Sequence, residues 1–159
     1  MTCKFQQNPG EEQWKAVKSI LKYLRRTKDY LLVYGGEEKL ADTGYTNASF
    51  QRDIDDYKSQ SGYTFIFNGG AVSWKSSKQA TTADSTTEAE YIAGSEADKN
   101  KHVPKKYHIL REMVETEEIR LDYVPTDDNL ADPFTKSLSL VKHNGHFENM
   151  GIRYVGDWL

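Results

Sequence analysis

The stretch GYTFIFNGGAVSWK at residues 62–75 decides the fold. In its first half, aromatic and β-branched residues alternate with other side chains, which is typical of a strand with one buried face. The following Asn68-Gly69-Gly70 offers residues that accept the positive φ angles of a tight hairpin turn. Residues 71–75 alternate again. The stretch therefore predicts two antiparallel strands joined by this turn.

The segments around the hairpin predict a mixture of helices and strands. Apolar residues at 14, 17, 21 and 24 recur at helical spacing and predict a helix over 10–28. Ser85 and Glu88 have the spacing of a capping box and predict a helix over 85–98. Further strands are predicted at 30–34, 40–45 and 119–123, and further helices after Pro104 and Asn129. From residue 139 onward no periodicity predicts an element. The fold class is therefore α+β.

Composition narrows the class of protein and its location. The chain has 159 residues, enough for one domain, and a net charge of -3, so no global basic field predicts nucleic-acid binding. The single cysteine, Cys3, excludes an internal disulfide and fits a reducing compartment. No apolar run reaches membrane-spanning length. We therefore expect an intracellular protein, cytoplasmic or nuclear, with neither a membrane nor a disulfide partner.

Two groups of basic residues are candidates for contact with nucleic acid. One is a stripe along the predicted N-terminal helix, and the other follows the hairpin. Each group has two interpretations, a solvated surface or a contact with phosphate groups, and both stay open. The residues concerned are Lys15, Lys18, Lys22, Arg25, Lys75 and Lys78.

Seven segments occur in an order that resembles the ribonuclease H domain of plant copia-type long-terminal-repeat retrotransposons. The resemblance implies a mixed sheet flanked by helices in three layers. It also implies that 1–29 is a remnant of the last reverse transcriptase helix, 30–138 a truncated ribonuclease H-like domain, and 139–159 the C-terminal tail of a Pol polyprotein. The seven segments lie at 44–50, 58–63, 72–79, 85–91, 101–108, 123–126 and 131–136.

The resemblance implies Mg²⁺-dependent hydrolysis of RNA in RNA–DNA hybrids, with two ions held by four carboxylates. The position of the first carboxylate is occupied here by Asn47. The second matches Glu88, with Glu90 on another side of the predicted helix, and the fourth matches Asp132. The third would lie on an inner strand for which this chain has no matching segment. The resemblance therefore implies that a few dozen residues of the family's pattern are absent from this chain, at the point between residues 98 and 101.

Two metal ligands, Glu88 and Asp132, remain, so Mg²⁺ or Mn²⁺ should bind weakly and cleavage should slow about a thousandfold or more. The favoured interpretation is a retrotransposon-derived ribonuclease H-like protein that is catalytically impaired. Two alternatives stay open. One is a non-catalytic module that binds RNA–DNA hybrid through its basic residues. The other is an active nuclease that recruits Asp42 or the acidic loop at 53–56 in place of the lost carboxylates.

The histidines are weaker candidates for a site. His143 and His146 have a spacing that permits metal binding on one helical face, but no cysteine or third ligand lies nearby in the sequence. A solvated tail is therefore predicted for both. His108 is predicted to pack or to cap a helix.

Overall fold

The computed structural model describes residues 7–35, 42–53, 56–98 and 120–158. The chain forms two compact units, Met1–Leu31 with Arg153–Leu159, and Leu32–Ile152. Residues 139–152 pack within the second unit. The helix expected after Pro104 lies outside the described residues, and so does His108.

The first unit is built on α1 (Glu11–Arg26), which confirms the helix expected over 10–28. Two glutamates in its first turn and two arginines in its last turn match the helix dipole. The Thr27 N–H donates to the Tyr23 carbonyl at 3.0 Å and ends the helix. The unit also holds η4 (Val155–Trp158), whose first N–H donates to the Asp29 carbonyl at 2.9 Å.

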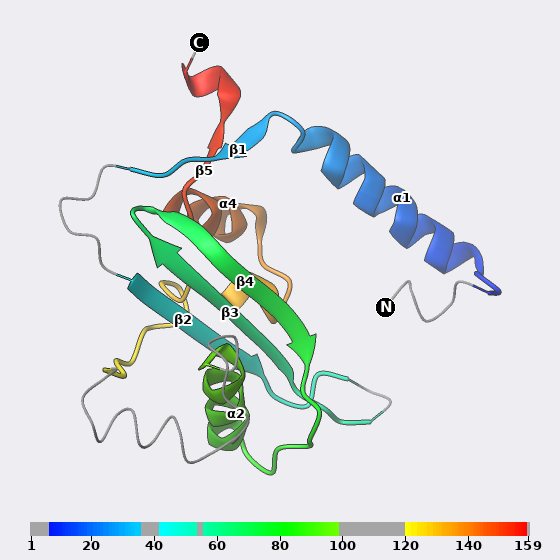
Figure 1. The fold of residues 1–159 in the computed structure, drawn as a ribbon. Coiled ribbons are helices and arrows are strands. Elements are labelled where there is room, and N and C mark those ends of the chain that lie inside the picture. Colours follow the sequence, from blue (N-terminus) through cyan, green and yellow to red (C-terminus); the bar gives the residue numbers. More distant parts are fainter. Residues whose placement is uncertain (1–6, 36–41, 54–55, 99–119, 159) are drawn as a thin grey trace. The chain divides into compact units, whose positions relative to one another are not determined.

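The second unit is organised by a three-stranded antiparallel sheet (Figure 1). Its strands are β2 (Asp42–Ser49), β3 (Gln60–Phe67) and β4 (Gly70–Lys78), in that spatial order. The predicted hairpin is confirmed, because Asn68 and Gly69 turn between β3 and β4 with φ angles of 49° and 75°. Two short strands, β1 (Tyr30–Leu32) and β5 (Ile152–Tyr154), pair separately.

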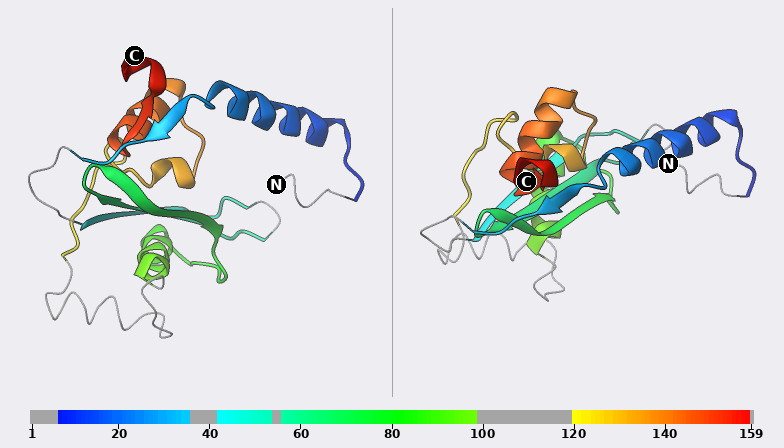
Figure 2. Two further views of the ribbon diagram at one scale, coloured as in Figure 1. Left: turned by 45° about the horizontal axis from the view of Figure 1, so that its top comes forward. Right: turned by 90° about the horizontal axis from the view of Figure 1, so that it is seen from above.

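Helices cover both faces of this sheet (Figure 2). On one face lies α2 (Thr86–Asp98), which confirms the helix expected over 85–98. On the other face lie the short 3-10 helix η3 (Asp132–Phe134) and α4 (Leu140–Asn149). The second unit is therefore a three-layer α+β structure, in which the sheet separates two helical layers.

Small side chains form the core between the sheet and α2. Ala83, Ala89 and Ile92 are buried there against Ala48 and Phe50. The buried Gln79 side chain links the two layers, since its Nε2 donates to Ser61 Oγ at 2.9 Å and to the Ala89 carbonyl at 2.8 Å. On the opposite face, Ala71, Leu130 and Met150 form a buried hydrophobic cluster.

Two expectations about the second unit are corrected. The sheet was expected to be mixed, but its pairings are antiparallel throughout. The strand expected at 119–123 is wrong over 120–123, which the structure describes without a strand. A strand needs a neighbour for its backbone hydrogen bonds, and none of the described residues supplies one. Within the described residues, β2 is consequently an edge strand of the sheet.

The region from residue 139 is more regular than its sequence suggests. Ser139 accepts a hydrogen bond from the Lys142 N–H and begins α4, and Met150 is buried just beyond its end. The helix is short and contains Gly145, so local preference for helix is weak and tertiary packing decides its formation. None of the helices in the described residues is long and apolar enough to cross a membrane.

Candidate carboxylate site

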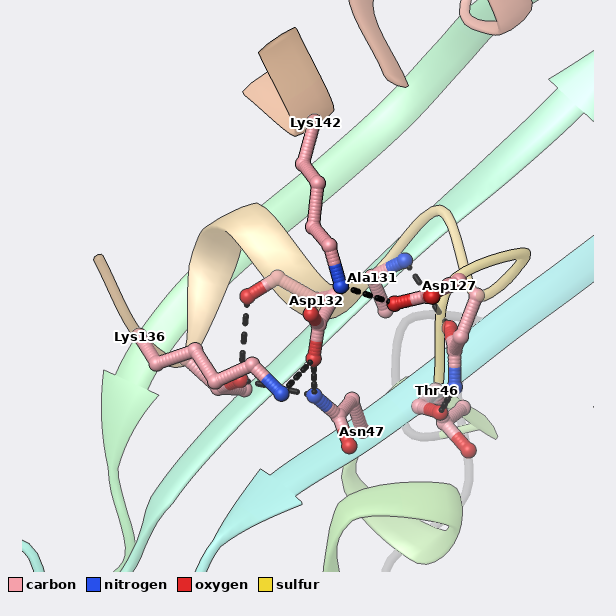
Figure 3. A network of polar contacts seen from close by, with 9 residues as sticks. Thr46, Asn47, Asp127, Ala131, Asp132, Lys136 and Lys142 are labelled. Atoms are coloured by element: carbon pink, nitrogen blue, oxygen red, sulfur yellow. Dashed lines mark hydrogen bonds and ion pairs between the residues drawn. The ribbon is translucent and has the colours of Figure 1, made fainter. Parts of the chain in front are cut away.

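The sheet and η3 bring Asn47 and Asp132 together, although they lie 85 residues apart in the sequence (Figure 3). Asn47 projects from β2, and its Nδ2 donates to Asp132 Oδ1 at 2.7 Å and to Thr135 Oγ1 at 2.7 Å. Asn129 fixes the start of η3, because its Oδ1 accepts the Ala131 N–H at 3.0 Å. The structure therefore joins two of the three residues that the sequence singled out.

Asp132 is a buried carboxylate with its own counter-charge. The residue is 2% exposed, and Lys136 Nζ lies 2.8 Å from the same Oδ1 that accepts the Asn47 amide. Lys136 follows Asp132 by four residues, so it reaches back over one turn. Both contacts to this oxygen come from hydrogen-bond donors, and the Lys136 ammonium brings an opposite charge to the carboxylate.

Helix α2 places Glu88 and Glu90 in different roles. Glu88 Oε2 accepts the Asp84 N–H at 2.7 Å, while the Glu88 N–H donates to Ser85 Oγ at 3.1 Å. These contacts make Glu88 an exposed capping residue at the start of the helix. Glu90 instead accepts the Ala48 N–H at the sheet edge and interacts electrostatically with Asp132 and Lys136. Glu90 therefore lies within electrostatic range of Asp132 and Lys136.

The environment of Glu90 alters its acidity. Although much of the residue is exposed, partial desolvation raises the pKa of its carboxyl group, and the charge of Asp132 raises it further. The Ala48 N–H and the Lys136 ammonium oppose this shift. A carboxylate with a raised pKa near a second, buried carboxylate is typical of functional sites. Sequence spacing alone predicted only that Glu90 lies on a different side of the helix from Glu88.

Helix α4 adds a histidine to the surroundings of Asp132. His146 is buried, at 3% exposure, so the prediction of a solvated tail is wrong for this residue. Burial lowers the pKa of the His146 imidazole, while the Asp132 and Asp127 carboxylates act to raise it. Lys142 forms an ion pair with Asp127 and lowers the pKa of that carboxyl group. The only signal in the sequence was the three-residue spacing of the two histidines.

No three His, Cys, Asp or Glu residues among those that the structure describes are grouped closely enough to hold a metal ion. Glu88 accepts a hydrogen bond from the Asp84 backbone N–H. The acidic loop is engaged too, because Asp53 and Asp56 lie 2.8 Å and 2.7 Å from Lys78 Nζ. Asp42 begins β2.

The six basic candidates fall into two groups, one in each compact unit. In α1, Lys15 forms ion pairs with Glu12 at 2.8 Å and Glu11 at 3.3 Å. On β4, Lys78 is held by the acidic loop, whereas Lys75 is exposed. The exposed residues of α1 also include Lys18, Lys22 and Arg25. Contact of these residues with nucleic acid stays a prediction.

The chain is similar to Pol polyproteins of plant retrotransposons. It is 38% identical, over 176 aligned positions, to the retrovirus-related Pol polyprotein from transposon TNT 1-94 of Nicotiana tabacum, covering 86% of this chain. It is 27% identical over 185 positions to that from transposon RE2 of Arabidopsis thaliana, covering 91%. It is also 45% identical over 95 positions to the secreted RxLR effector protein 161 of Plasmopara viticola, covering 58% of this chain and 66% of that protein. No family model and no solved structure matches.

The chain spans 13% of the length of each of these two polyproteins. Both alignments, of 176 and 185 positions, are longer than the chain itself, which has 159 residues. The polyproteins must therefore carry residues within the matched region that have no counterpart here.

Proposed function

We propose, from the premise that this chain is a relative of plant copia-type retrotransposon Pol polyproteins, that it is a ribonuclease H-like domain impaired in hydrolysis of RNA–DNA hybrids. One observation carries the proposal. The buried Asp132 carboxylate gives the same oxygen to the Asn47 amide and to the Lys136 ammonium. That oxygen is consequently unavailable to a metal ion unless both donors move away.

The residues present do not fit a pair of magnesium ions. Mg²⁺ requires oxygen ligands, and two such ions close together need several negative charges to offset their repulsion. Asn47 contributes no charge and turns its donor nitrogen toward Asp132. Glu90 is a further carboxylate within electrostatic range of Asp132, and partial burial together with the charge of Asp132 raises the pKa of its carboxyl group. We therefore derive no step of hydrolysis that uses bound metal.

The Lys136 ammonium takes over part of the electrostatic role of a metal ion. This group neutralises Asp132 and so stabilises a buried charge that would otherwise be costly. An ammonium group cannot coordinate and ionise a water molecule, so the pair supplies no nucleophile. The chemistry of the site is consistent with a stable fold that has little hydrolytic activity.

The alternative, a module that binds RNA–DNA hybrid without cutting it, draws on the exposed basic residues. Lys18, Lys22 and Arg25 on α1 are exposed, whereas Lys15 and Lys78 are engaged in ion pairs. Phosphate contacts would make binding weaken steeply as salt rises. A salt titration of hybrid binding therefore distinguishes this alternative from a domain that has lost both functions.

The decisive experiment measures cleavage of a labelled RNA–DNA hybrid in Mg²⁺ and separately in Mn²⁺. A ribonuclease H with a complete carboxylate set serves as the positive control. We expect the chain to cleave at least about a thousandfold more slowly than this control, since two charged ligands are lost. Circular dichroism of the same sample establishes that the protein is folded.

Two matched variants, Glu90→Gln and Glu88→Gln, test whether any residual cleavage belongs to this site. Cleavage close to the rate of the positive control, abolished by Glu90→Gln and retained by Glu88→Gln, would overturn the proposal. Cleavage that survives both substitutions indicates a contaminating nuclease. Background cleavage from a folded sample supports the proposal.

A further inference from the structure

Among the described residues of the second unit, one edge of β2 has no strand partner. One edge of β2 pairs with β3 along the whole of its length. In an antiparallel ladder, both backbone polar groups of a residue point to the same side, and the side alternates along the strand. The Thr46 carbonyl accepts the Asn129 amide at 2.8 Å, so Thr46 points away from β3. Gly44 and Ala48 point outward with it, and we call these three N–H groups the outward amides.

Only side chains meet this outer edge among the described residues. Asn129 contacts the carbonyl of Thr46, and Glu90 accepts the N–H of Ala48. Edge strands are commonly protected from other strands by lysine, proline or a bulge. The sequence of β2, DTGYTNAS, has no lysine or proline, and its register with β3 is unbroken. The outer edge is therefore well suited to accept another strand.

A second segment of the same unit has the sequence pattern of a strand but does not pair as one. Residues 120–124, RLDYV, alternate as a strand would, yet they form none. In the described part of the chain, their backbone groups take part in no backbone hydrogen bond. Leu121 is 62% exposed and Tyr123 is 90% exposed. The segment thus combines strand-forming sequence, unpaired backbone groups and apolar side chains in water.

We propose that two copies of this chain associate by β-pairing, with residues 120–124 of each copy lying along the outer edge of β2 of the other. The exchange is reciprocal, so it closes as a two-fold dimer. It gives strand partners to backbone groups of β2 and of residues 120–124 that have no backbone partner on that side among the described residues, and it covers Leu121 and Tyr123. Charge does not oppose it, because β2 has a single charged residue, Asp42, and the segment carries one charge of each sign. This inference is independent of the proposed catalytic impairment.

Sedimentation and amide exchange of the whole chain, from about 10 µM to about 1 mM, test the proposal. We expect the mass to double over this range. The outward amides should exchange at least about tenfold more slowly at the higher concentration, since exchange then requires the dimer to open. The amides of Tyr45 and Asn47 are the internal control, because they face β3 and are protected in the monomer as well.

The variant Leu121→Pro removes an N–H from the segment without touching any backbone hydrogen bond of the described residues. Its control, Leu121→Ala, keeps that N–H. We expect Leu121→Pro to stay monomeric with normal protection at Tyr45 and Asn47, and Leu121→Ala to dimerise, though less tightly. The proposal is overturned by a monomer at all concentrations, whether or not the outward amides are protected. A dimer that Leu121→Pro leaves intact overturns it equally.

Discussion

The Asn47 side-chain amide donates to the Asp132 carboxylate across 2.7 Å, and this bond ties β2 to η3. A carboxylate at position 47 would face Asp132 at the same distance, which two ionised groups tolerate only with a cation between them. The neutral amide removes this repulsion, and Lys136 supplies the remaining positive charge. Asn47 and Lys136 are therefore complementary parts of one arrangement that stabilises Asp132 from within the chain.

Replacing Asn47 with aspartate should destabilise the fold through charge repulsion. We expect Asn47→Asp to lower the free energy of unfolding at pH 7 by about 2–4 kcal/mol, since a hydrogen-bonded donor becomes a like charge beside a buried carboxylate. Asn47→Ala loses the same two hydrogen bonds without adding charge, and should cost about 1–3 kcal/mol. Urea unfolding measures both.

The pH dependence separates repulsion from the lost hydrogen bonds. The loss of unfolding free energy in Asn47→Asp should shrink as the pH falls toward about 4, because the carboxyl group introduced at position 47 then begins to bind a proton. The deficit of Asn47→Ala should change much less. Equal deficits at both pH values would show that repulsion between positions 47 and 132 is absent.

Removing the Lys136 ammonium should leave Asp132 with only neutral donors. A fully buried charge that loses its partner costs about 3–5 kcal/mol, but Lys136 is 36% exposed, so about 1–3 kcal/mol is expected for Lys136→Met. Lys75→Met is the control, because Lys75 is an exposed lysine on β4. In a protein that already carries Asp132→Asn, Lys136→Met should lower the free energy of unfolding much less than it does in the wild type. Additive effects of the two substitutions would contradict the ion pair.

The hairpin and α2 could be predicted because their signals are local. Asn68 and Gly69 determine the turn, and Ser85 and Glu88 determine the start of the helix. The rotation of α2 about its axis was harder to predict. Its buried side includes Ala89 and Ala93, small residues whose pattern contrasts little with the exposed side. Residues two positions apart differ by about 200° around a helix, so the choice between Glu88 and Glu90 required the packed structure.

Features that depend on distant segments could not be predicted. Alternation at 119–123 indicates a strand, but a strand forms only where another chain segment accepts its hydrogen bonds. The buried state of His146 likewise depends on α4 packing within the second unit. The sequence offered Asn47 and Asp132 as members of one site only through family resemblance, since no local rule connects residues in different elements.

Substitutions at the start of α2 should separate the two glutamates. Ser85→Ala removes the oxygen that accepts the Glu88 N–H and should cost about 1 kcal/mol of stability. Glu88→Ala should cost about 0.5–1 kcal/mol, because it loses the bond to Asp84 and a negative charge near the helix N-terminus. Urea unfolding at pH 7 measures both values. Wild-type stability in both variants would contradict the capping role.

Glu90→Gln should behave differently at the same pH. The folded protein raises the pKa of Glu90, so the ionised group is less favourable in the fold than in the unfolded chain. Glutamine keeps an oxygen that can accept the Ala48 N–H and carries no charge. We expect a stability equal to or slightly above that of the wild type at pH 7, measured by urea unfolding. A loss comparable to that of Ser85→Ala would show that the ionised carboxylate supports the fold.

Protonation of His146 should make the fold sensitive to mild acid. Burial lowers the pKa of this imidazole below its ordinary value of 6.5, so the unfolded chain binds the proton more readily than the folded one. The stabilisation is fully present above about pH 6.5 and is lost as the pH falls toward the folded pKa, by at most about 1.4 kcal/mol per pH unit. His146→Gln should reduce the change in unfolding free energy between about pH 5 and 7, measured by urea unfolding at several pH values. His143→Gln, one turn away on α4, is the control, and a wild-type slope in His146→Gln would assign the acid sensitivity to another group.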